Sequence, residues 1–347
     1  MPRVRRVSLA SPGYARRRRG RGFEYLDSGG RTIRDPEILG RIRALAIPPA
    51  WTDVWICPDP LGHLQASGVD AAGRRQYLYH ERWRAWRDRR KFLRMRSFAR
   101  ALPELREAVE RELDRDELDR DRILALAVRL LDRALFRVGS ERYAERNGSH
   151  GLSTLLKEHV EISDGQVSFD FPAKSGLRRL VSVRDEQAKE ILRHLKARRD
   201  GGDRLLAYRN GVGWREVGAE DINAYLRELA GDGFTAKDFR TWHATVLAAL
   251  ALAARVDPDS PLTQRKRAVA AAVKEVAETL GNTPAVCRSS YVDPTVVDAF
   301  LEGRTIAPRL AEIDRDDLDD PRIQAEVEAA VLELLTEDVE ERERAVA

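Results

Sequence analysis

The sequence predicts an α+β fold, with a small, mostly β N-terminal domain and a larger, mostly α domain. Residues 22–79 form short stretches of alternating apolar and polar residues separated by turn signals. From about residue 102 to residue 311, apolar residues instead recur at helical spacing. Residues 159–183 return to the β pattern, which predicts a three-stranded sheet inside the helical domain.

The predicted strands of the N-terminal domain follow one another closely. FEYLD-SGG-RTIRD is a hairpin candidate with its turn at Asp27–Gly30. DVWICPDPLGHLQASGVD predicts two further short strands on either side of residues 58–62. GRRQYLYH supplies the last strand, and it places Tyr77 and Tyr79 on one face because they are two positions apart.

An arginine-rich helix is expected from Glu81, leading into a linker near Leu102 and Pro103. Further on, residues 119–139 carry apolar side chains three and four positions apart, as a buried helix does. In the β segment, Asp164-Gly165 is a strong hairpin turn signal, and LRRLVSV predicts the third strand.

Charge is distributed unevenly along the chain, although the net charge is only +4. Residues 1–100 hold 23 Lys and Arg against nine Asp and Glu, whereas residues 312–347 hold four against 14. The basic segment favours a polyanion partner, and nucleic acid is the obvious one. The alternative is a basic surface that serves solubility.

Several classes of protein are disfavoured by the totals. The longest apolar run, residues 244–254, is well short of the roughly 20 residues that a membrane span needs, and the basic N-terminus lacks the apolar core of a secretory signal. Cys57 and Cys287 are the only cysteines, which predicts a reducing cytoplasm. Because no metal-binding motif occurs, metal-independent chemistry is expected.

Attack by a tyrosine on a phosphodiester without a metal needs cations, hydrogen-bond donors and a general acid. Five residues supply these types in order along the chain: Arg137, Lys174, Arg240, Asn282 and Tyr291. Each also has an ordinary structural explanation. Arg137 could neutralise a helix end, Lys174 could be a solvated turn residue, and Arg240 could form a surface salt bridge with Asp238. Likewise, Asn282 could cap a helix and Tyr291 could be a packed aromatic residue.

The segments that contain these residues resemble a known family. FRVGSERYAERNGSHGLSTL, FPAKSG, KDFRTWHAT and LGNTP…SSYVDP are similar, in order and spacing, to the catalytic segments of type IB DNA topoisomerases. The short poxvirus-like and bacterial branch matches best, and GHLQASGVDAAGRRQYLYH resembles its small domain. The resemblance covers about residues 22–305.

The resemblance implies a role for each candidate. Tyr291 would be the nucleophile that forms a 3′-phosphotyrosyl bond, and Arg137 and Arg240 would bind the scissile phosphate. Lys174 would be the general acid for the leaving 5′ oxygen. Asn282 stands where many relatives have histidine, so this position would act by hydrogen bonding, because an amide does not titrate near neutral pH.

The resemblance also implies DNA contacts and a domain organisation. Arg75, Gln76, Tyr77 and Tyr79 match positions that such enzymes place on DNA. The expected domains are a basic, disordered arm (residues 1–21), a DNA-clamping domain (22–100), a catalytic domain (101–311) and an acidic tail (312–347). The tail is expected to be solvated, with a helix near residues 321–335. A sharper hypothesis is that it competes with DNA for the basic surface.

The implied function is relaxation of positive and negative supercoils in duplex DNA, by a monomer in the cytoplasm, without ATP or any cofactor. One alternative is a tyrosine recombinase, which shares the chemistry but usually carries His-x-x-Arg where this chain has Lys237-Asp-Phe-Arg240. The other alternative is a non-catalytic DNA-binding protein, which would never become covalently attached to DNA.

Overall fold

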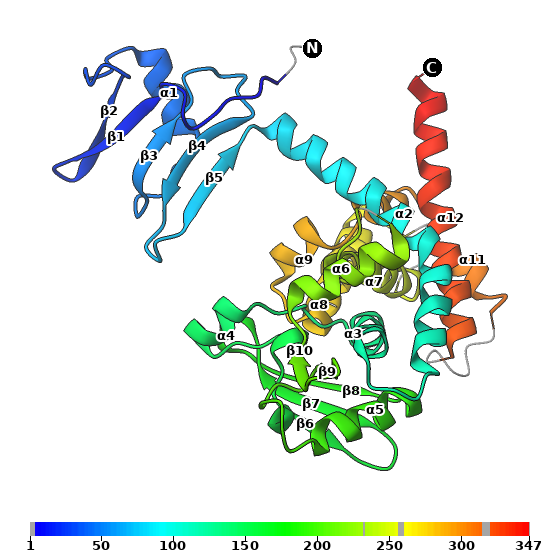
Figure 1. Ribbon diagram of the computed structural model, residues 1–347. Coiled ribbons are helices and arrows are strands. Elements are labelled where there is room, and N and C mark those ends of the chain that lie inside the picture. Colours follow the sequence, from blue (N-terminus) through cyan, green and yellow to red (C-terminus); the bar gives the residue numbers. More distant parts are fainter. Residues whose placement is uncertain (1–3, 232, 256–259, 314–319, 347) are drawn as a thin grey trace. The chain divides into compact units, whose positions relative to one another are not determined.

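The computed structural model describes residues 4–231, 233–255, 260–313 and 320–346 (Figure 1). The chain forms two compact units, Met1–Leu93 and Arg94–Ala347. Within the described residues, no helix combines the length and the hydropathy that crossing a membrane would require.

The N-terminal unit is built on one five-stranded antiparallel sheet with strand order β2-β1-β3-β4-β5. Its strands are β1 Tyr14–Arg19, β2 Gly22–Leu26, β3 Thr52–Ile56, β4 Leu64–Val69 and β5 Arg75–Tyr79. The turn at Asp27–Gly30 forms as expected, with Gly30 N donating to Asp27 O at 3.0 Å. After this turn the chain does not form a full second strand: it pairs with β2 at one isolated bridge, between Leu26 and Thr32.

The expectation of a disordered arm over residues 1–21 is wrong for the residues described. β1 pairs with β2 on one side and β3 on the other. Arg16, one of its arginines, donates hydrogen bonds to the backbone carbonyls of Ile47, Pro48 and Trp51. The carbonyls of a neighbouring loop thus accept the hydrogen bonds of the Arg16 guanidinium, and these bonds help to hold the basic strand in the sheet.

Helix α1 (Pro36–Ala44) covers this sheet. Asp35 caps it by accepting hydrogen bonds from Glu37 N and Ile38 N, and Pro36 occupies the first turn, where no N–H is needed. Four buried residues form the centre of the core: Ile42, Val54, Ile56 and Ala66.

Helix α2 runs without interruption from Glu81 to Leu113. The linker predicted at Leu102 and Pro103 is therefore wrong. Leu102, Leu105 and Val109 are all buried, and this packing outweighs the hydrogen bond that a proline inside a helix removes.

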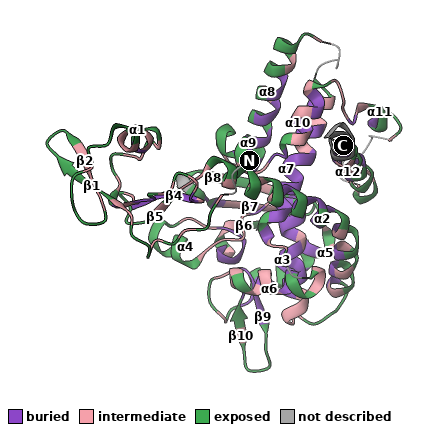
Figure 2. Cartoon of the chain, turned by 90° about the horizontal axis from the view of Figure 1, so that it is seen from above, coloured by how far each residue is buried: buried purple, intermediate pink, exposed green. Residues whose placement is uncertain are grey.

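The larger unit is mostly helical, as predicted (Figure 1). Its further helices are α3 Arg120–Ala134, α4 Glu141–Asn147, α5 Glu186–Ala197, α6 Ala219–Ala230, α7 Ala236–Ala253, α8 Leu262–Leu280, α9 Pro284–Ser290, α10 Pro294–Leu301, α11 Ala307–Leu310 and α12 Pro321–Val346. Short 3-10 helices occupy Leu152–Thr154, Lys157–His159 and Lys174–Gly176. Figure 2 shows α3 and α7 as largely buried, and fully buried side chains on α7 include Phe239 and Trp242.

The predicted three-stranded sheet is present in this unit, with order β6-β7-β8. Its strands are β6 Val160–Ile162, β7 Val167–Pro172 and β8 Arg178–Val183, and a separate hairpin pairs β9 Ala207–Arg209 with β10 Trp214–Glu216. The alternation in β7 buries Phe169 and Phe171, which pack against Phe136 with ring centroids 5.0 and 5.7 Å away. Phe136 thereby fixes the end of α3 against the sheet.

The acidic end of the chain is not a solvated helix, contrary to expectation. Helix α12 buries Val331 and Leu335 completely, and it packs against α7, α10 and α11. Glu326, Glu333 and Glu337 are exposed on the same helix, so the described part of the segment is amphipathic. Residues 314–319 of the predicted tail lie outside the described residues.

Leu335→Ala should therefore lower the free energy of unfolding by about 2–5 kcal/mol, because it leaves a cavity under α12. Urea unfolding followed by the fluorescence of buried tryptophan measures the loss. The control Glu337→Ala, at an exposed position of the same helix, should stay within about 0.5 kcal/mol of wild type. Equal stabilities for the two variants would show that α12 is not packed in solution.

Candidate active site

Arg137 lies just beyond the end of α3. Leu135 ends the helix in the left-handed region, at φ 54°, and this turns the chain toward α8. Arg137 Nη2 then donates hydrogen bonds to Gly281 O at 2.7 Å and to Asn282 Oδ1 at 2.6 Å. The backbone around Arg137 is held by Leu152 N, which donates to Arg137 O at 2.8 Å.

Asn282 follows α8, which ends at Gly281 with φ 61°. Its backbone N–H donates to Ala277 O at 2.8 Å, so it also has the capping role that the sequence allowed. Because Asn282 Oδ1 accepts from Arg137, the amide orientation is fixed and Nδ2 is the free end. That Nδ2 is buried and has no hydrogen-bond partner among the described residues.

Arg240 occupies the first turn of α7 and is only 2% exposed. It donates to the carbonyls of Leu135 and Leu280, and the second of these bonds is 2.8 Å long. The alternative explanation of Arg240, a salt bridge with Asp238, does not hold, because Asp238 pairs with Arg94 at 3.0 Å and caps its own helix. Arg240 therefore joins the ends of α3 and α8.

Tyr291 closes the short helix α9, with its N–H donating to Cys287 O at 2.9 Å. Its ring is half-buried and lies 5.4 Å from Arg240 Cζ and 5.6 Å from Lys237 Nζ, measured to the ring centroid. A negative charge on the phenol oxygen would be stabilised by these cations. Tyr291 is thus a partly accessible aromatic residue beside guanidinium groups, and not a residue walled into an apolar core.

Lys174 is exposed and begins the 3-10 turn between β7 and β8. It lines a cavity of about 670 Å³ together with Arg137 and Asn282. The structure therefore interlocks Arg137, Arg240 and Asn282 beside Tyr291, and places Lys174 on the wall of the adjoining cavity.

The positive charges of Arg137 and Arg240 favour binding of an anion at this cluster. Burial and then the charge of Arg137 lower the pKa of Arg240 to about 10. Burial also lowers the pKa of Arg137, which the neighbouring Tyr291 opposes. Both guanidinium groups remain charged at neutral pH because the pKa of arginine is intrinsically high. Among the described residues no carboxylate forms an ion pair with either of them, so both can bind phosphate oxygens in pairs.

Comparison with known proteins places the chain in a family. Residues 80–302 match the family described as the catalytic core of eukaryotic DNA topoisomerase I, and residues 22–70 match the N-terminal domain of bacterial DNA topoisomerase IB. The chain belongs to the type IB DNA topoisomerases. The recombinase and the non-catalytic alternatives fit these matches less well.

Two viral relatives match most of the chain. It is 32% identical to the DNA topoisomerase 1B of Acanthamoeba polyphaga mimivirus, over 78% of this chain and 81% of the relative. It is 24% identical to the DNA topoisomerase 1B of Vaccinia virus (strain Copenhagen), over 76% of this chain and 81% of the relative.

The DNA-contact residues predicted for this topoisomerase lie on β5 in the N-terminal unit. Arg75 is paired with Asp53, and Gln76 Nε2 donates to Asp70 Oδ2 at 2.9 Å. Tyr77 is exposed and stacks on Tyr79, with ring centroids 6.1 Å apart. The two tyrosines present free surface, whereas the polar groups of Arg75 and Gln76 are engaged by carboxylates.

Two groups of residues were missed by sequence analysis. Trp83 and Trp86 at the start of α2 stack 4.8 Å apart, and Arg90 lies over Trp86. His63 lies between this pair and β5, with its ring centroid 4.8 Å from Trp83 and 6.2 Å from Tyr79. The three-residue spacing of the tryptophans on a helix was the available signal. The second is Arg179 on β8, which lines the same cavity as Arg137.

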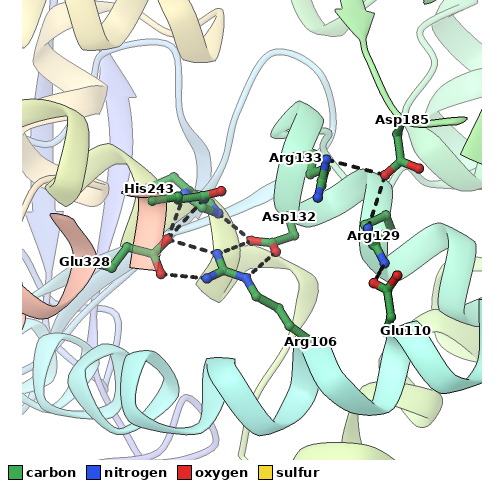
Figure 3. Close-up of polar contacts among 9 residues, drawn as sticks. Arg106, Glu110, Arg129, Asp132, Arg133, Asp185, His243 and Glu328 are labelled. Carbon is green, nitrogen blue, oxygen red and sulfur yellow. Dashed lines mark hydrogen bonds and ion pairs between the residues drawn. The ribbon is translucent and has the colours of Figure 1, made fainter. Parts of the chain in front are cut away.

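A buried ionic network supports the two helices that position the arginines (Figure 3). Arg106 of α2 binds Asp132 of α3 and Glu328 of α12, with its shortest contacts at 2.8 Å. His243 Nε2 lies 2.7 Å from Asp132 Oδ1. His243 is one turn beyond Arg240, and Asp132 is one turn before Leu135, so the network holds α3 and α7 together immediately behind the site.

The pKa of Asp132 is well below its ordinary value of 3.8: burial raises it, but His243 and Arg106 outweigh burial. Ionised Asp132 therefore stabilises the fold above about pH 4, and this contribution is lost as the pH falls further. Asp132→Asn should lower the free energy of unfolding by about 3–5 kcal/mol near neutral pH.

Urea unfolding at a series of pH values tests this expectation. The stability of wild type should fall more steeply on acidification than that of Asp132→Asn. The control Glu104→Gln, at an exposed position of α2, should follow the wild-type profile. Parallel profiles for wild type and Asp132→Asn would contradict a depressed pKa at this position.

Proposed function

We propose that this topoisomerase relaxes supercoiled duplex DNA by cleaving and rejoining one strand through Tyr291. The observation that carries the proposal is the mutual fixation of Arg137, Arg240 and Asn282 beside the Tyr291 ring. The arrangement gathers two cations, a hydrogen-bond donor and a phenol, which is what attack on a phosphodiester requires.

In the cleavage step, Tyr291 Oη attacks the phosphorus and loses its proton to solvent. The new phosphotyrosyl bond forms as the bond from phosphorus to the 5′ oxygen breaks. Lys174 donates a proton to that oxygen, which leaves as a 5′ hydroxyl. Lys174 suits this role because it is on a turn that borders the cavity, where its long side chain can reach a bound strand.

Charge accumulates on the non-bridging oxygens of phosphorus in the transition state. Arg137 and Arg240 bind these oxygens, and their fixed positions avoid the cost of reorganisation during the reaction. Asn282 Nδ2 donates a further hydrogen bond, since its Oδ1 is already used by Arg137. No proton transfer passes through Asn282.

Between cleavage and rejoining, the free end rotates about the intact strand, which relaxes supercoils of either sign. The 5′ hydroxyl then attacks the phosphotyrosine and restores Tyr291. Rejoining needs neither ATP nor a metal, because the phosphotyrosyl bond retains the energy of the broken phosphodiester. The enzyme acts as a monomer on chromosomal DNA in the cytoplasm, with Arg75, Gln76, Tyr77 and Tyr79 contacting the duplex.

Tyr291→Phe should abolish relaxation of supercoiled plasmid in EDTA without ATP, while leaving the thermal unfolding temperature unchanged. The substitution removes one oxygen and keeps the ring beside Arg240. Wild type trapped with SDS should give a covalent protein–DNA adduct, and Tyr291→Phe should give none. A wild-type protein that binds plasmid but neither relaxes it nor forms an adduct would sink the proposal.

Asn282→Ala should slow single-turnover cleavage by about 10²–10³-fold, the typical effect of losing one transition-state donor. Because an amide does not titrate, the ratio of the two rates should stay constant between about pH 6 and pH 8. Asn210→Ala, in the exposed turn between β9 and β10, is the matched control and should cleave at the wild-type rate. A ratio that changes tenfold over this range would refute the hydrogen-bonding role.

A further inference from the structure

Arg179 is one of four arginines that line the cavity beside the proposed active site, together with Arg133, Arg137 and Arg178. It lies on β8, directly opposite Phe171 of β7, and it lines the cavity with Arg137, Lys174 and Asn282. A Cβ atom built on Gly281 would lie 3.0 Å from Arg179 Nη1 and 4.0 Å from Arg137 Nη1. The two guanidinium groups therefore flank the same point at the end of α8.

The charge of Arg179 has no counterion in the described part of the chain. No hydrogen bond or ion pair joins it to another described residue, and its Nε is buried without a partner. The next residue along the strand is different: Arg178 is exposed and makes a bidentate contact with Asp170, at 2.6 and 2.7 Å. Both arginines line the cavity, but Arg178 is paired with a carboxylate and the Arg179 side chain has no partner among the described residues.

Such an arrangement is costly in the free protein. Burial and the nearby charge of Arg137 lower the pKa of Arg179 to about 10, so the group stays charged at neutral pH. A buried charge without a partner is normally avoided, unless a ligand supplies the missing one. The ligand must be anionic, must reach the cavity wall and must offer oxygens to a planar fork, which describes a phosphodiester.

We propose that Arg179 is a phosphate-binding residue, which contacts a phosphodiester of the cleaved strand at or next to the bond that Tyr291 attacks. The proposal rests on the proposed function and extends it to a residue outside the predicted five. Arg179 also lies five positions beyond Lys174 on the same hairpin, so its contact would draw the Lys174 turn toward the bound strand.

Arg179→Met tests the proposal, because it removes the charge and keeps most of the side-chain length. On a duplex with a cleavage site mapped for wild type, it should slow single-turnover cleavage by about 10- to 100-fold, the range expected for one charged hydrogen-bonding group. Arg178→Met removes a positive charge from the same strand and should have a much smaller effect. Equal losses in the two variants would overturn the proposal.

A second measurement separates phosphate binding from a structural role. Duplexes that carry one uncharged methylphosphonate, at the cleaved position or at either neighbour, are cleaved by wild type and Arg179→Met. At the phosphate that Arg179 contacts, the difference between the two proteins should shrink to less than about threefold, because neither protein can then gain from the charge. A difference that persists at all three positions would assign Arg179 to structure.

Stability provides an independent check. Since no other described residue pairs with the Arg179 side chain, Arg179→Met should unfold at the wild-type temperature or above it. A variant that unfolds earlier or fails to fold would show that Arg179 stabilises the fold, and would overturn the proposal. Failure of wild type to cleave any duplex would instead contradict the proposed function.

Discussion

The arrangement of the site depends on one interaction, the hydrogen bonding of Arg240 to the ends of two helices. Its guanidinium satisfies the carbonyls of Leu135 at the end of α3 and Leu280 at the end of α8. Helix ends leave such carbonyls unpaired and carry partial negative charge, so they stabilise a buried cation without neutralising it. Arg137 and Asn282 each follow two residues after these carbonyls, and their positions are therefore set by the same contact.

Carboxylates in the larger unit are placed so that the site keeps its positive charge. Asp132 and Glu328 are taken up by Arg106 and His243 in the network of Figure 3, and Asp238 is taken up by Arg94. These ion pairs hold helices together by direct attraction. The arginines at the site are held by carbonyls and a carboxamide instead, so they stay available to an incoming anion. Arginines that join helices by ion pairs and arginines at the site thus have different kinds of partner.

The sequence was sufficient for the fold class, the three-stranded sheet and the proximity of four of the five candidate residues, because these follow from local periodicity and from motifs in a fixed order. Three features needed the structure. The continuity of α2 through Pro103 depends on burial on one face, and the order of β1 depends on carbonyls supplied by a distant loop. Arg179 looked equivalent to Arg178 until the structure showed that Arg178 is paired with Asp170 and that the Arg179 side chain has no partner among the described residues.

The ionic network gives the acidic helix α12 a structural role. Its Glu328 reaches inward to Arg106, beneath the helices that carry the site. The Glu328 side chain is only 7% exposed, and a buried carboxylate is tolerated only while its cationic partners remain in place. The C-terminal segment is therefore packed into the larger unit: it links the end of the chain to the positions of α3 and α7, and through them to Arg137 and Arg240.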